Sequence, residues 1–312
     1  MPEFKHSPVM VAEVVAVLRP QPGGRYADGT VGGAGHAAAI LVASSPGGRL
    51  YGCDRDGEAV EAAERKLAEF CGRFEIRQGN FAELAGWVPP CSCDGVLLDL
   101  GVSSLHLDEA GRGFSFQQDG PLDMRIDQRQ GLTAAGLVNE ASVEDLTRVF
   151  WELGGERDAR QFARAIARER ERRRFETTRQ LAELIERLAP RRGRKTHPAT
   201  KVFQAVRMAV NDEIGSLQQG LVGALKILKP GGRLVVITFH SLEDRIVKDF
   251  GRARARDYTF TGGMDVPELR RPRAPELRWL QRKALCPGAA EVAANPRSRS
   301  AQMRVMEKLG DG

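Results

Sequence analysis

The sequence predicts an α/β fold, in which a doubly wound, mostly parallel sheet carries an inserted, mainly helical subdomain. Short apolar strands alternate with helical patterns in residues 10–100 and again in residues 229–306, as they do in chains of βαβ units. A glycine-rich turn joins the first of these strands to its helix. After Gly101 the alternation stops for about a hundred residues, and helical patterns replace it.

The first part of the chain is expected to supply four parallel strands. Each is a short apolar run bounded by glycine or polar residues, and the helices between them repeat apolar residues every three or four positions. The predicted strands are residues 25–28, 50–54, 74–77 and 95–100. The predicted helices are residues 10–18, 36–44 and 58–70. Right-handed crossovers would connect these strands.

The insert and the return to the sheet follow. Helical patterns cover residues 143–153, 159–174 and 178–188. Pro198 suits the first turn of a long helix, whose apolar stripe comprises Val202, Val206, Val210, Ile214, Leu217, Leu221 and Leu225. The remaining predictions are a turn at 229–232, a strand at 233–239, a helix at 242–250, an Arg- and Pro-rich loop at 270–275 and a strand at 302–306. The predicted domains are residues 1–105 and 197–312 for the sheet and residues 106–196 for the insert.

Composition narrows the class of protein. The 312 residues are 42% apolar and 28% charged, which is typical of a globular protein that can bury a core. The apolar runs are far shorter than the ~20 residues that cross a bilayer, and the N-terminus has no signal-peptide pattern. Five cysteines without CxxC spacing argue against a disulfide framework and a zinc site. We therefore expect a cytoplasmic protein without a membrane partner or a metal.

Positive charge is concentrated in one segment. The chain has a formal charge of +6, but residues 156–195 hold fourteen Arg or Lys against seven Asp or Glu, a net of +7. A solvated helix face with Glu partners is the usual explanation of such a run. The density of arginine in residues 168–174 and 191–195 exceeds what Glu169 and Glu171 can neutralise, so we interpret the segment as a phosphate-contacting surface.

The glycine-rich turn at residues 28–36 is the first candidate for a ligand site. Glycines let a ligand approach the backbone, and free N–H groups at the helix start can hold polar groups. Such a turn can bind a dinucleotide, another cofactor or nothing. Asp54 ends the next strand about twenty residues downstream, where a carboxylate can accept hydrogen bonds from ribose hydroxyls. Its alternative role is a helix N-cap.

Two more strand ends extend the candidate site. Phe81 follows the third strand and offers a flat ring for an adenine, and Asp99 ends the fourth strand at the carboxyl edge of the sheet, where open α/β folds bind ligands. Phe81 by itself would be interpreted as a core residue. Together with Asp28, Asp54 and Asp99 it favours a ligand site.

Several long motifs resemble the bacterial ribosomal RNA small-subunit methyltransferase H family. They cover nearly the whole chain in the order that the family has, and they are residues 94–104, 112–116, 119–125, 197–200, 203–207, 239–245 and 295–300. The resemblance implies a class I methyltransferase fold with a helical insert and S-adenosylmethionine as cofactor. It also implies methylation of the N4 amine of a cytidine in the decoding region, with small-subunit ribosomal RNA or the small ribosomal subunit as partner.

The resemblance assigns the cofactor site residue by residue. The residues that match the family's cofactor contacts are Ala34, Gly35, His36, Asp54, Phe81, Asp99 and His106. The chain departs from the family pattern at two places, where Leu105-His106 replaces Pro-Gln and Gly33-Ala34 replaces Arg-Gly.

Asp99 is the candidate catalytic residue. The lone pair of the cytosine amine is delocalised into the ring, so an acceptor that pulls on its N–H would assist the transfer, and Asp99 or a nearby carbonyl could be that acceptor. Polar residues of the matching motifs have either a substrate-lining or a structural role: Asp123, Arg125, His197, Lys201, Arg207, His240, Ser241, Glu243 and Asp244. The alternatives are a nicotinamide-dependent oxidoreductase on the same turn, or a non-catalytic RNA-binding protein of ribosome assembly.

Overall fold

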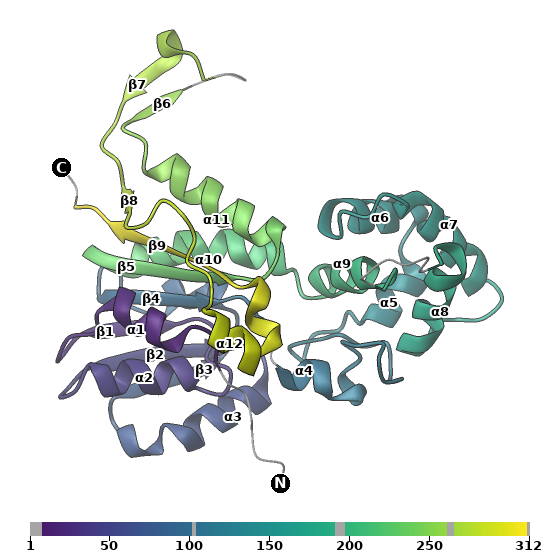
Figure 1. Ribbon diagram of the computed structural model, residues 1–312, viewed down its shortest axis with the longest axis horizontal. Helices are drawn as coiled ribbons and strands as arrows, with labels where there is room; N and C mark the ends of the chain where they lie inside the picture. The colour runs from purple at the N-terminus through teal and green to yellow at the C-terminus, as the bar shows by residue number, and fades with distance from the viewer. Residues whose placement is uncertain (1–7, 102–103, 191–196, 261–264, 311–312) are drawn as a thin grey trace. The chain divides into compact units, whose positions relative to one another are not determined.

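The computed structural model describes residues 8–101, 104–190, 197–260 and 265–310, and it divides the chain into two compact units. The first unit consists of Met1–Gly101 and Gly215–Gly312, and the second of Val102–Ile214. Figure 1 shows the sheet in the first unit and helices in the second. Each unit is described by itself below.

A seven-stranded sheet organises the first unit. Its strands are β1 (Arg25–Asp28), β2 (Arg49–Asp54), β3 (Phe74–Gln78), β4 (Cys93–Asp99), β5 (Leu228–Thr238), β8 (Leu277–Trp279) and β9 (Gln302–Lys308). The strand order is β3-β2-β1-β4-β5-β9-β8. The first five strands are parallel to one another, and β9 is antiparallel to both of its neighbours. The order reverses between β1 and β4, and ligands of doubly wound sheets bind at the carboxyl ends of the strands at such a point.

Helices cover both faces of this sheet (Figure 1). They are α1 (Val11–Leu18), α2 (Gly35–Ala43), α3 (Gly57–Lys66), α10 (Glu213–Ile227) and α11 (Ser241–Arg254), and α12 (Ala289–Ala294) precedes β9. The alternation along β4 shows the two faces. Leu97 belongs to the core beneath α1, α2 and α3, whereas Val96 and Leu98 belong to the core beneath α10 and α11. Because both faces are covered, the central strands are continuous apolar runs rather than alternating ones.

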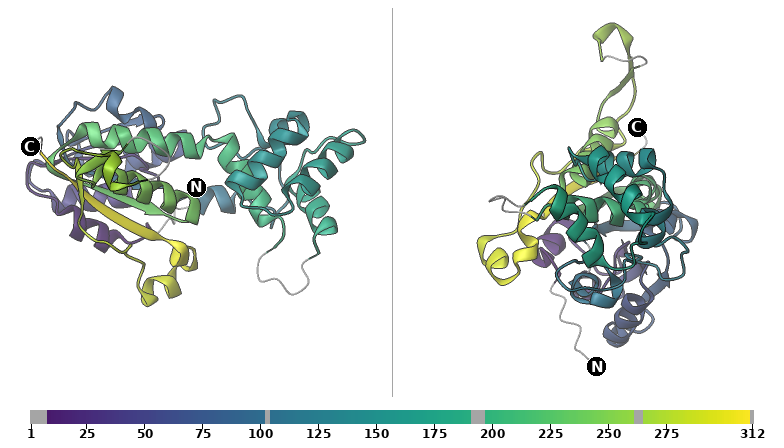
Figure 2. Two further views of the ribbon diagram at one scale, coloured as in Figure 1. Left: turned by 90° about the horizontal axis from the view of Figure 1, so that it is seen from above. Right: turned by 90° about the vertical axis from the view of Figure 1, so that its right-hand side faces the viewer.

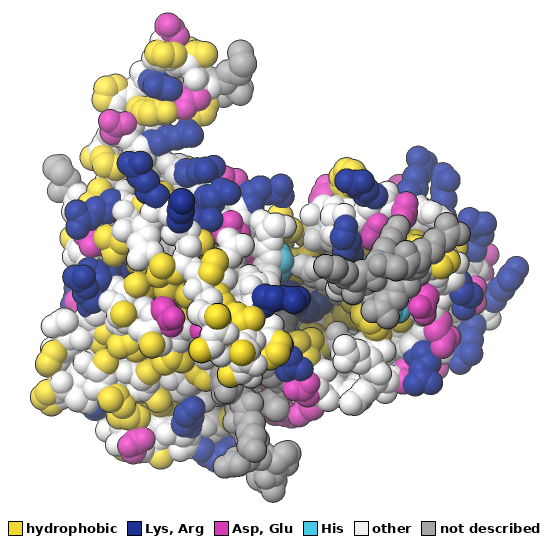
Figure 3. Space-filling view, viewed as in Figure 1, with side chains coloured by type: hydrophobic (Ala, Val, Ile, Leu, Met, Phe, Trp, Pro, Cys, Tyr) yellow, Lys and Arg dark blue, Asp and Glu magenta, His cyan; other side chains and the backbone are white. Residues whose placement is uncertain are grey.

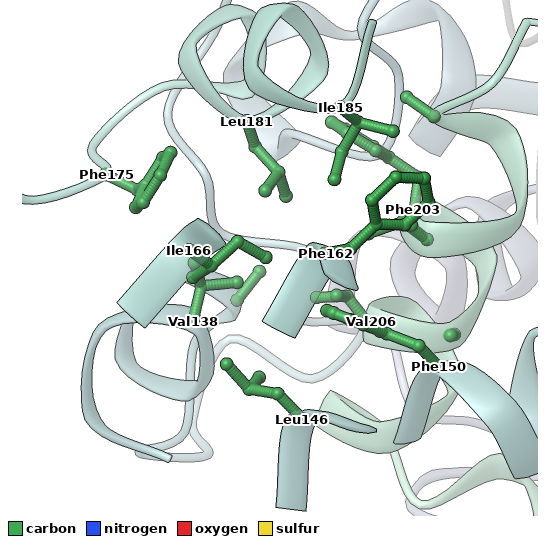
Figure 4. Close-up of a cluster of buried hydrophobic side chains, with 14 of the residues drawn as sticks. Val138, Leu146, Phe150, Phe162, Ile166, Phe175, Leu181, Ile185, Phe203 and Val206 are labelled. Carbon is green, nitrogen blue, oxygen red and sulfur yellow. The ribbon is translucent and has the colours of Figure 1, made fainter. Parts of the chain in front are cut away.

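The second unit has its own core. Its helices are α4 (Ser104–Asp108), α5 (Ala134–Glu140), α6 (Val143–Arg148), α7 (Ala159–Arg170), α8 (Thr178–Leu188) and α9 (Thr200–Val210), with a π-helical turn at Val149–Leu153 after α6. Phe150, Phe162, Leu181 and Phe203 point toward one another from four of these elements and are buried (Figure 4). The predicted helical insert therefore folds around a hydrophobic core of its own.

The single long helix predicted from Pro198 to Leu225 is wrong. The chain forms α9 and α10 instead, and Asp212 between them has a left-handed φ of 43°. Asn211 holds this break, because its amide donates to the Met124 carbonyl oxygen at 2.7 Å and its Oδ1 accepts from the Ile126 N–H at 2.8 Å. The boundary between the units consequently falls at residue 214, whereas the sequence pattern placed it at 196.

The residues predicted to form an Arg- and Pro-rich loop instead contribute a strand. β7 (Arg270–Pro272) pairs antiparallel with β6 (Tyr258–Phe260) in a separate two-stranded sheet. This hairpin follows α11 and extends away from the rest of the first unit in both Figure 1 and the right-hand view of Figure 2. Within the described residues, no helix combines the length and the apolar character needed to span a membrane.

Candidate active site

Three carboxylates lie at the carboxyl ends of adjacent strands. Asp28 ends β1, Asp54 ends β2 and Asp99 ends β4. The parallel register pairs Asp28 with Gly52 of β2 and with Leu97 of β4, so all three strand ends meet at the point where the strand order reverses. The grouping that the sequence predicted for Asp28, Asp54 and Asp99 is thus present in the first unit.

The turn after β1 is shaped by packing against neighbouring side chains. A Cβ on Gly29 would lie 2.5 Å from Leu98 Cδ2, and a Cβ on Gly35 would lie 2.3 Å from Pro8 Cγ. Both glycines are therefore required by neighbouring side chains. Gly32 has a φ of +49°, and a Cβ there would meet only one backbone atom, at 3.9 Å. Ala34 is buried with a φ of 56° and precedes α2, a conformation that L-residues other than glycine adopt at a cost.

Asp54 is bound to this turn. Its Oδ2 accepts from the Gly32 N–H at 2.9 Å, and its Oδ1 accepts from the Asp56 N–H at 2.9 Å. The N-cap of α3 is Asp56, whose side chain accepts from the Glu58 N–H. The capping role that the sequence left open for Asp54 is therefore filled by Asp56, and Asp54 instead joins the end of β2 to the glycine turn.

Phe81 lies between the glycine turn and α10. A Cβ on Gly220 of α10 would lie 2.3 Å from Phe81 Cδ2, so the ring packs directly against the helix backbone. The ring remains only half-buried. Asn80 ties the segment of Phe81 to α10, because its amide donates to the Ser216 hydroxyl at 2.7 Å while its Oδ1 accepts from the Ala82 N–H. Core packing of one part of Phe81 and a ligand contact of another are thus compatible.

Asp99 is a largely buried carboxyl, 13% exposed, whose pKa is raised. Burial raises the pKa of Asp99 to about 7, against the opposing effect of the Gly101 backbone N–H. Its backbone N–H donates to the Thr30 hydroxyl at 2.7 Å, and its Oδ1 is buried without a hydrogen-bond partner among the described residues. Burying a polar oxygen without a partner is costly, so this atom is suited to a donor or a cation that a ligand brings.

His36 and Asp28 lie beneath the same turn. His36 Nε2 is 2.9 Å from the Val9 carbonyl oxygen. A carbonyl only accepts, so Nε2 is assigned as the N–H and Nδ1 faces Asp99 Oδ2 at 3.8 Å. Burial raises the pKa of Asp28 to about 6 and lowers the pKa of His36. His36 is almost fully buried beside Asp99.

Thr30 and Gly220 were not singled out from the sequence. The Thr30 N–H donates to Asp28 Oδ1 at 3.0 Å, and its hydroxyl bonds the backbone of Asp99. A Thr two residues after a strand-ending Asp is a signal that could have indicated it, since such side chains bond locally in turns. Gly220 could have been noticed as a glycine inside an amphipathic helix pattern, because such a glycine often marks close packing against the helix.

The remaining predicted cofactor residue, His106, belongs to the second unit. It is buried on α4 and stacks on Phe114 with ring centroids 4.9 Å apart. His197, in the same unit, packs on Phe116 with centroids 4.6 Å apart, and Lys201 donates to the Gly155 carbonyl oxygen.

Ionic and capping contacts engage most of the other predicted polar residues. Arg125 pairs with Asp123 and Arg207 pairs with Glu213, each through two hydrogen bonds. In the first unit His240 and Glu243 form the capping box of α11, and Asp244 is paired with the buried Arg304. The structural alternative for Arg207, an ion pair with a carboxylate, is therefore present. His240 is a helix cap rather than a core histidine, and Asp244 is buried against Arg304 rather than lying on an ordinary helix face with Arg245.

Comparison with known proteins identifies the family. Residues 3–309 match the model of the MraW methylase family. A protein named Ribosomal RNA small subunit methyltransferase H from Syntrophotalea carbinolica is 50% identical over 311 residues, which are 98% of this chain and 98% of that protein. Its namesakes from Symbiobacterium thermophilum and Geobacter sulfurreducens are 49% and 50% identical over 99% and 98% of this chain, and over 98% and 99% of their own lengths.

The strand order agrees with a methylase. The five parallel strands are followed by β9, which is antiparallel to both neighbours, and β8 lies at the edge of the sheet. This is the strand arrangement of class I methyltransferases, whose methyl donor is S-adenosylmethionine. The nicotinamide interpretation of the glycine turn is therefore set aside. With a match that spans nearly its whole length and a sheet of this topology, the chain belongs to the MraW methylase family.

Proposed function

We propose that this methyltransferase transfers a methyl group to the N4 amine of a cytidine in small-subunit ribosomal RNA. The observation that carries the proposal is the end-to-end match to relatives named for methylation of that RNA. The largely buried Asp99 carboxyl at the end of β4 supports the choice of an exocyclic amine, because an amine whose lone pair is delocalised needs an acceptor for its proton.

S-adenosylmethionine fits the residues at the strand ends. Its sulfonium and ammonium groups are cationic, and three carboxylates meet where the strand order reverses. The unpartnered Asp99 Oδ1 is the atom that such a cation or donor would satisfy. We infer that Asp54 holds the ribose and Phe81 the adenine, beside the turn of Ala34, Gly35 and His36. When bound, the cofactor supplies an activated methyl group on sulfur.

The protein's own contribution is positioning and proton handling. A carboxyl with a pKa of about 7 is partly ionised near neutral pH, which is the range in which a positioned acid or base is most effective. The Thr30 hydroxyl accepts a hydrogen bond from the Asp99 backbone N–H and so holds the end of β4 in place. The target base must leave its stack before it can reach this group.

Arginines of the second unit support an RNA partner. Arg172 and Arg173 are exposed, and no carboxylate among the described residues lies within 4.0 Å of either. Arg170 has a structural role instead, because it donates to the Val138 and Ala141 carbonyl oxygens. The arginines at 191, 192 and 194 lie outside the described residues.

Replacing Arg172 and Arg173 together with Ala is expected to weaken binding of small-subunit ribosomal RNA. The slope of log K against log salt should become less negative by about 0.7–0.9 for each phosphate that the protein no longer neutralises. Arg129→Ala/Arg148→Ala is the matched control, since both arginines are exposed but each is already paired with an aspartate at 2.7 Å. Equal slopes for the two double variants would refute an electrostatic RNA contact at this surface.

The proposed function is tested on the product. Unmodified small-subunit RNA, free or in assembled subunits, is incubated with the protein and S-adenosylmethionine, digested to nucleosides and analysed by mass spectrometry. The expected product is a cytidine methylated at N4. Methylation of another base, or of C5 of cytosine, would contradict the proposal while leaving the family assignment intact.

A further inference from the structure

The hairpin after α11 carries a second concentration of positive charge. Residues 252–283 hold nine Arg or Lys against four Asp or Glu, a net of +5. Together with the +7 of residues 156–195, this leaves the other 240 residues with a net charge of −6. Outside residues 156–195 the chain has a net charge of only −1. That small sum conceals the basic segment at residues 252–283, because acidic residues elsewhere offset it. We call the last turn of α11 with the β6–β7 hairpin, residues 252–260 and 265–273, the arm.

The charges of the arm are under-neutralised. Asp265 is shared by Arg256 at 3.5 Å and Arg270 at 2.7 Å, and outside the arm Glu276 is shared by Arg254 and Arg273 at 3.9 and 3.6 Å. Each of these two carboxylates thus faces two guanidinium groups. With Asp257 and Glu268 also counted, the arm holds six arginines against three carboxylates of its own, a net of +3.

Two further arginines add to this excess. Arg271 is exposed, and no described carboxylate lies within 4.0 Å of it. Arg252 is 60% exposed and only loosely paired with Asp249, at 3.9 Å. Figure 3 shows dark blue side chains along the arm and at its base.

Aromatic rings hold some of these guanidinium groups in place. Arg256 lies over the rings of Tyr258 and Phe260, with 5.7 Å to each centroid, and Arg270 lies 4.3 Å from the centroid of Tyr258. The strand register pairs Phe260 with Arg270 and Thr259 with Arg271. Because side chains alternate along a strand, Arg271 is on the face opposite Arg270. The arm therefore has a stacked aromatic and arginine face and a second, freely charged face.

The arginines and aromatic rings of the arm are not arranged to form a buried core. None of the side chains from Arg252 to Arg273 is buried among the described residues, and Leu269 is 42% exposed. A two-stranded sheet without a core is only marginally stable by itself. All six cations of the arm are arginine, whose planar, weakly hydrated group suits bidentate contacts with phosphate and stacking on rings. Among the described residues of the arm, Leu269 is the only large apolar side chain that is exposed, so an apolar protein partner would find little apolar surface there.

We propose that the arm is a second binding surface for the phosphate backbone of the RNA substrate, separate from the arginines of the second unit. This inference rests on the proposed function, since it takes ribosomal RNA as the substrate. The contacts would position the RNA rather than read its sequence, because phosphates carry no sequence information. The opposite possibility, an acidic protein of the subunit, is an outcome of the test.

The test uses the full chain with Arg252→Ala and Arg271→Ala combined. These two side chains are exposed and take part in no close ion pair with the described residues, so the melting temperature should not change. The control variant Arg65→Ala/Lys66→Ala removes two charges from α3 in the same unit, where Arg65 is 70% exposed. Binding of protein-free small-subunit RNA is measured as a function of salt concentration.

The arm variant is expected to bind the RNA more weakly than the wild type. Its salt slope should be less negative by about 1.4–1.8, because two phosphates are no longer neutralised. The control should retain the wild-type slope, and Arg271→Lys with Arg252 intact should retain most of it, because lysine keeps the charge. Affinity for S-adenosylmethionine and the rate at saturating RNA should stay at the wild-type level.

An arm variant whose slope and affinity equal those of the control overturns the proposal. So does a loss of affinity that is seen only with assembled subunits and not with protein-free RNA, which would indicate a protein partner. The identity of the methylated nucleoside is decided by mass spectrometry of the wild-type reaction, so failure of the proposed function is recognised independently of the arm.

Discussion

Asp99→Asn is expected to remove most of the methyl transfer and, at the same time, to stabilise the free protein at pH 8. Burial raises the pKa of Asp99 from 3.8 to about 7, so the folded state holds this proton more tightly than the unfolded state. The stability that the bound proton contributes is fully present below pH 4 and is lost as the pH rises through about 7. A shift of about three units corresponds to at most ~4 kcal/mol, and asparagine avoids that cost.

Activity should change in the opposite direction. The ionised Asp99 is the form that can accept the amine's hydrogen bond or hold a cation, so the turnover number should fall by ~10²–10⁴, as expected for a positioned acid–base group. The wild-type rate should rise with pH to a plateau above about 7, where Asp99 is ionised, and the variant should lack this transition.

The measurements are single-turnover methylation at saturating cofactor and thermal unfolding at pH 5 and pH 8. Asp94→Asn is the matched control, because Asp94 lies on the same strand away from its carboxyl end, is partly exposed, and pairs with Lys229 at 2.9 Å. A folded Asp99→Asn protein with wild-type turnover and wild-type KM would remove Asp99 from the site.

Asp54→Ala is expected to weaken binding of S-adenosylmethionine by roughly tenfold to a hundredfold. A charge-assisted hydrogen bond contributes about 1.5–3 kcal/mol, and the carboxylate at the end of β2 is the group that we place against the ribose. The substitution also frees the Gly32 and Asp56 N–H groups, which loosens the turn and adds to the loss.

Isothermal calorimetry checks this prediction. Asp56→Ala serves as the control, because Asp56 caps α3 and bonds the Glu58 N–H without being placed against the cofactor. Asp54→Asn keeps the size of the side chain and one acceptor for the turn, so its affinity should fall between those of Asp54→Ala and the wild type. Unchanged affinity in Asp54→Ala would rule out the assignment.

Much of the first unit was determined by local sequence. The strands that end in Asp28, Asp54 and Asp99 were predicted within a residue or two of their observed ends. Parallel strands bring their carboxyl ends to one edge, so three carboxylates that end three strands were bound to meet there. In the second unit, helix 178–188 was predicted with its observed bounds, because its apolar period and the Thr177 cap are both local signals.

Other features required contacts between residues far apart in the chain. Asn211 breaks the predicted long helix by bonding the backbone of Met124, 87 residues away, and the periodicity of the helix contains no trace of that partner. Arg170 belongs to the arginine-rich run of residues 168–174, yet its bonds to the Val138 and Ala141 carbonyl oxygens give it a structural role.

In the candidate site, too, local sequence set some features and contacts distant in the chain set others. The sequence placed Asp99 at the end of a strand, but the pKa of about 7 follows from burial by surrounding elements. Phe81 can pack against α10 only where that helix offers a glycine, and it does so at Gly220. The sequence by itself therefore determined which side chains gather at the edge of the sheet. The tertiary structure decided their protonation, their hydrogen bonds and the space around them, because solvent exclusion and close packing depend on the whole fold.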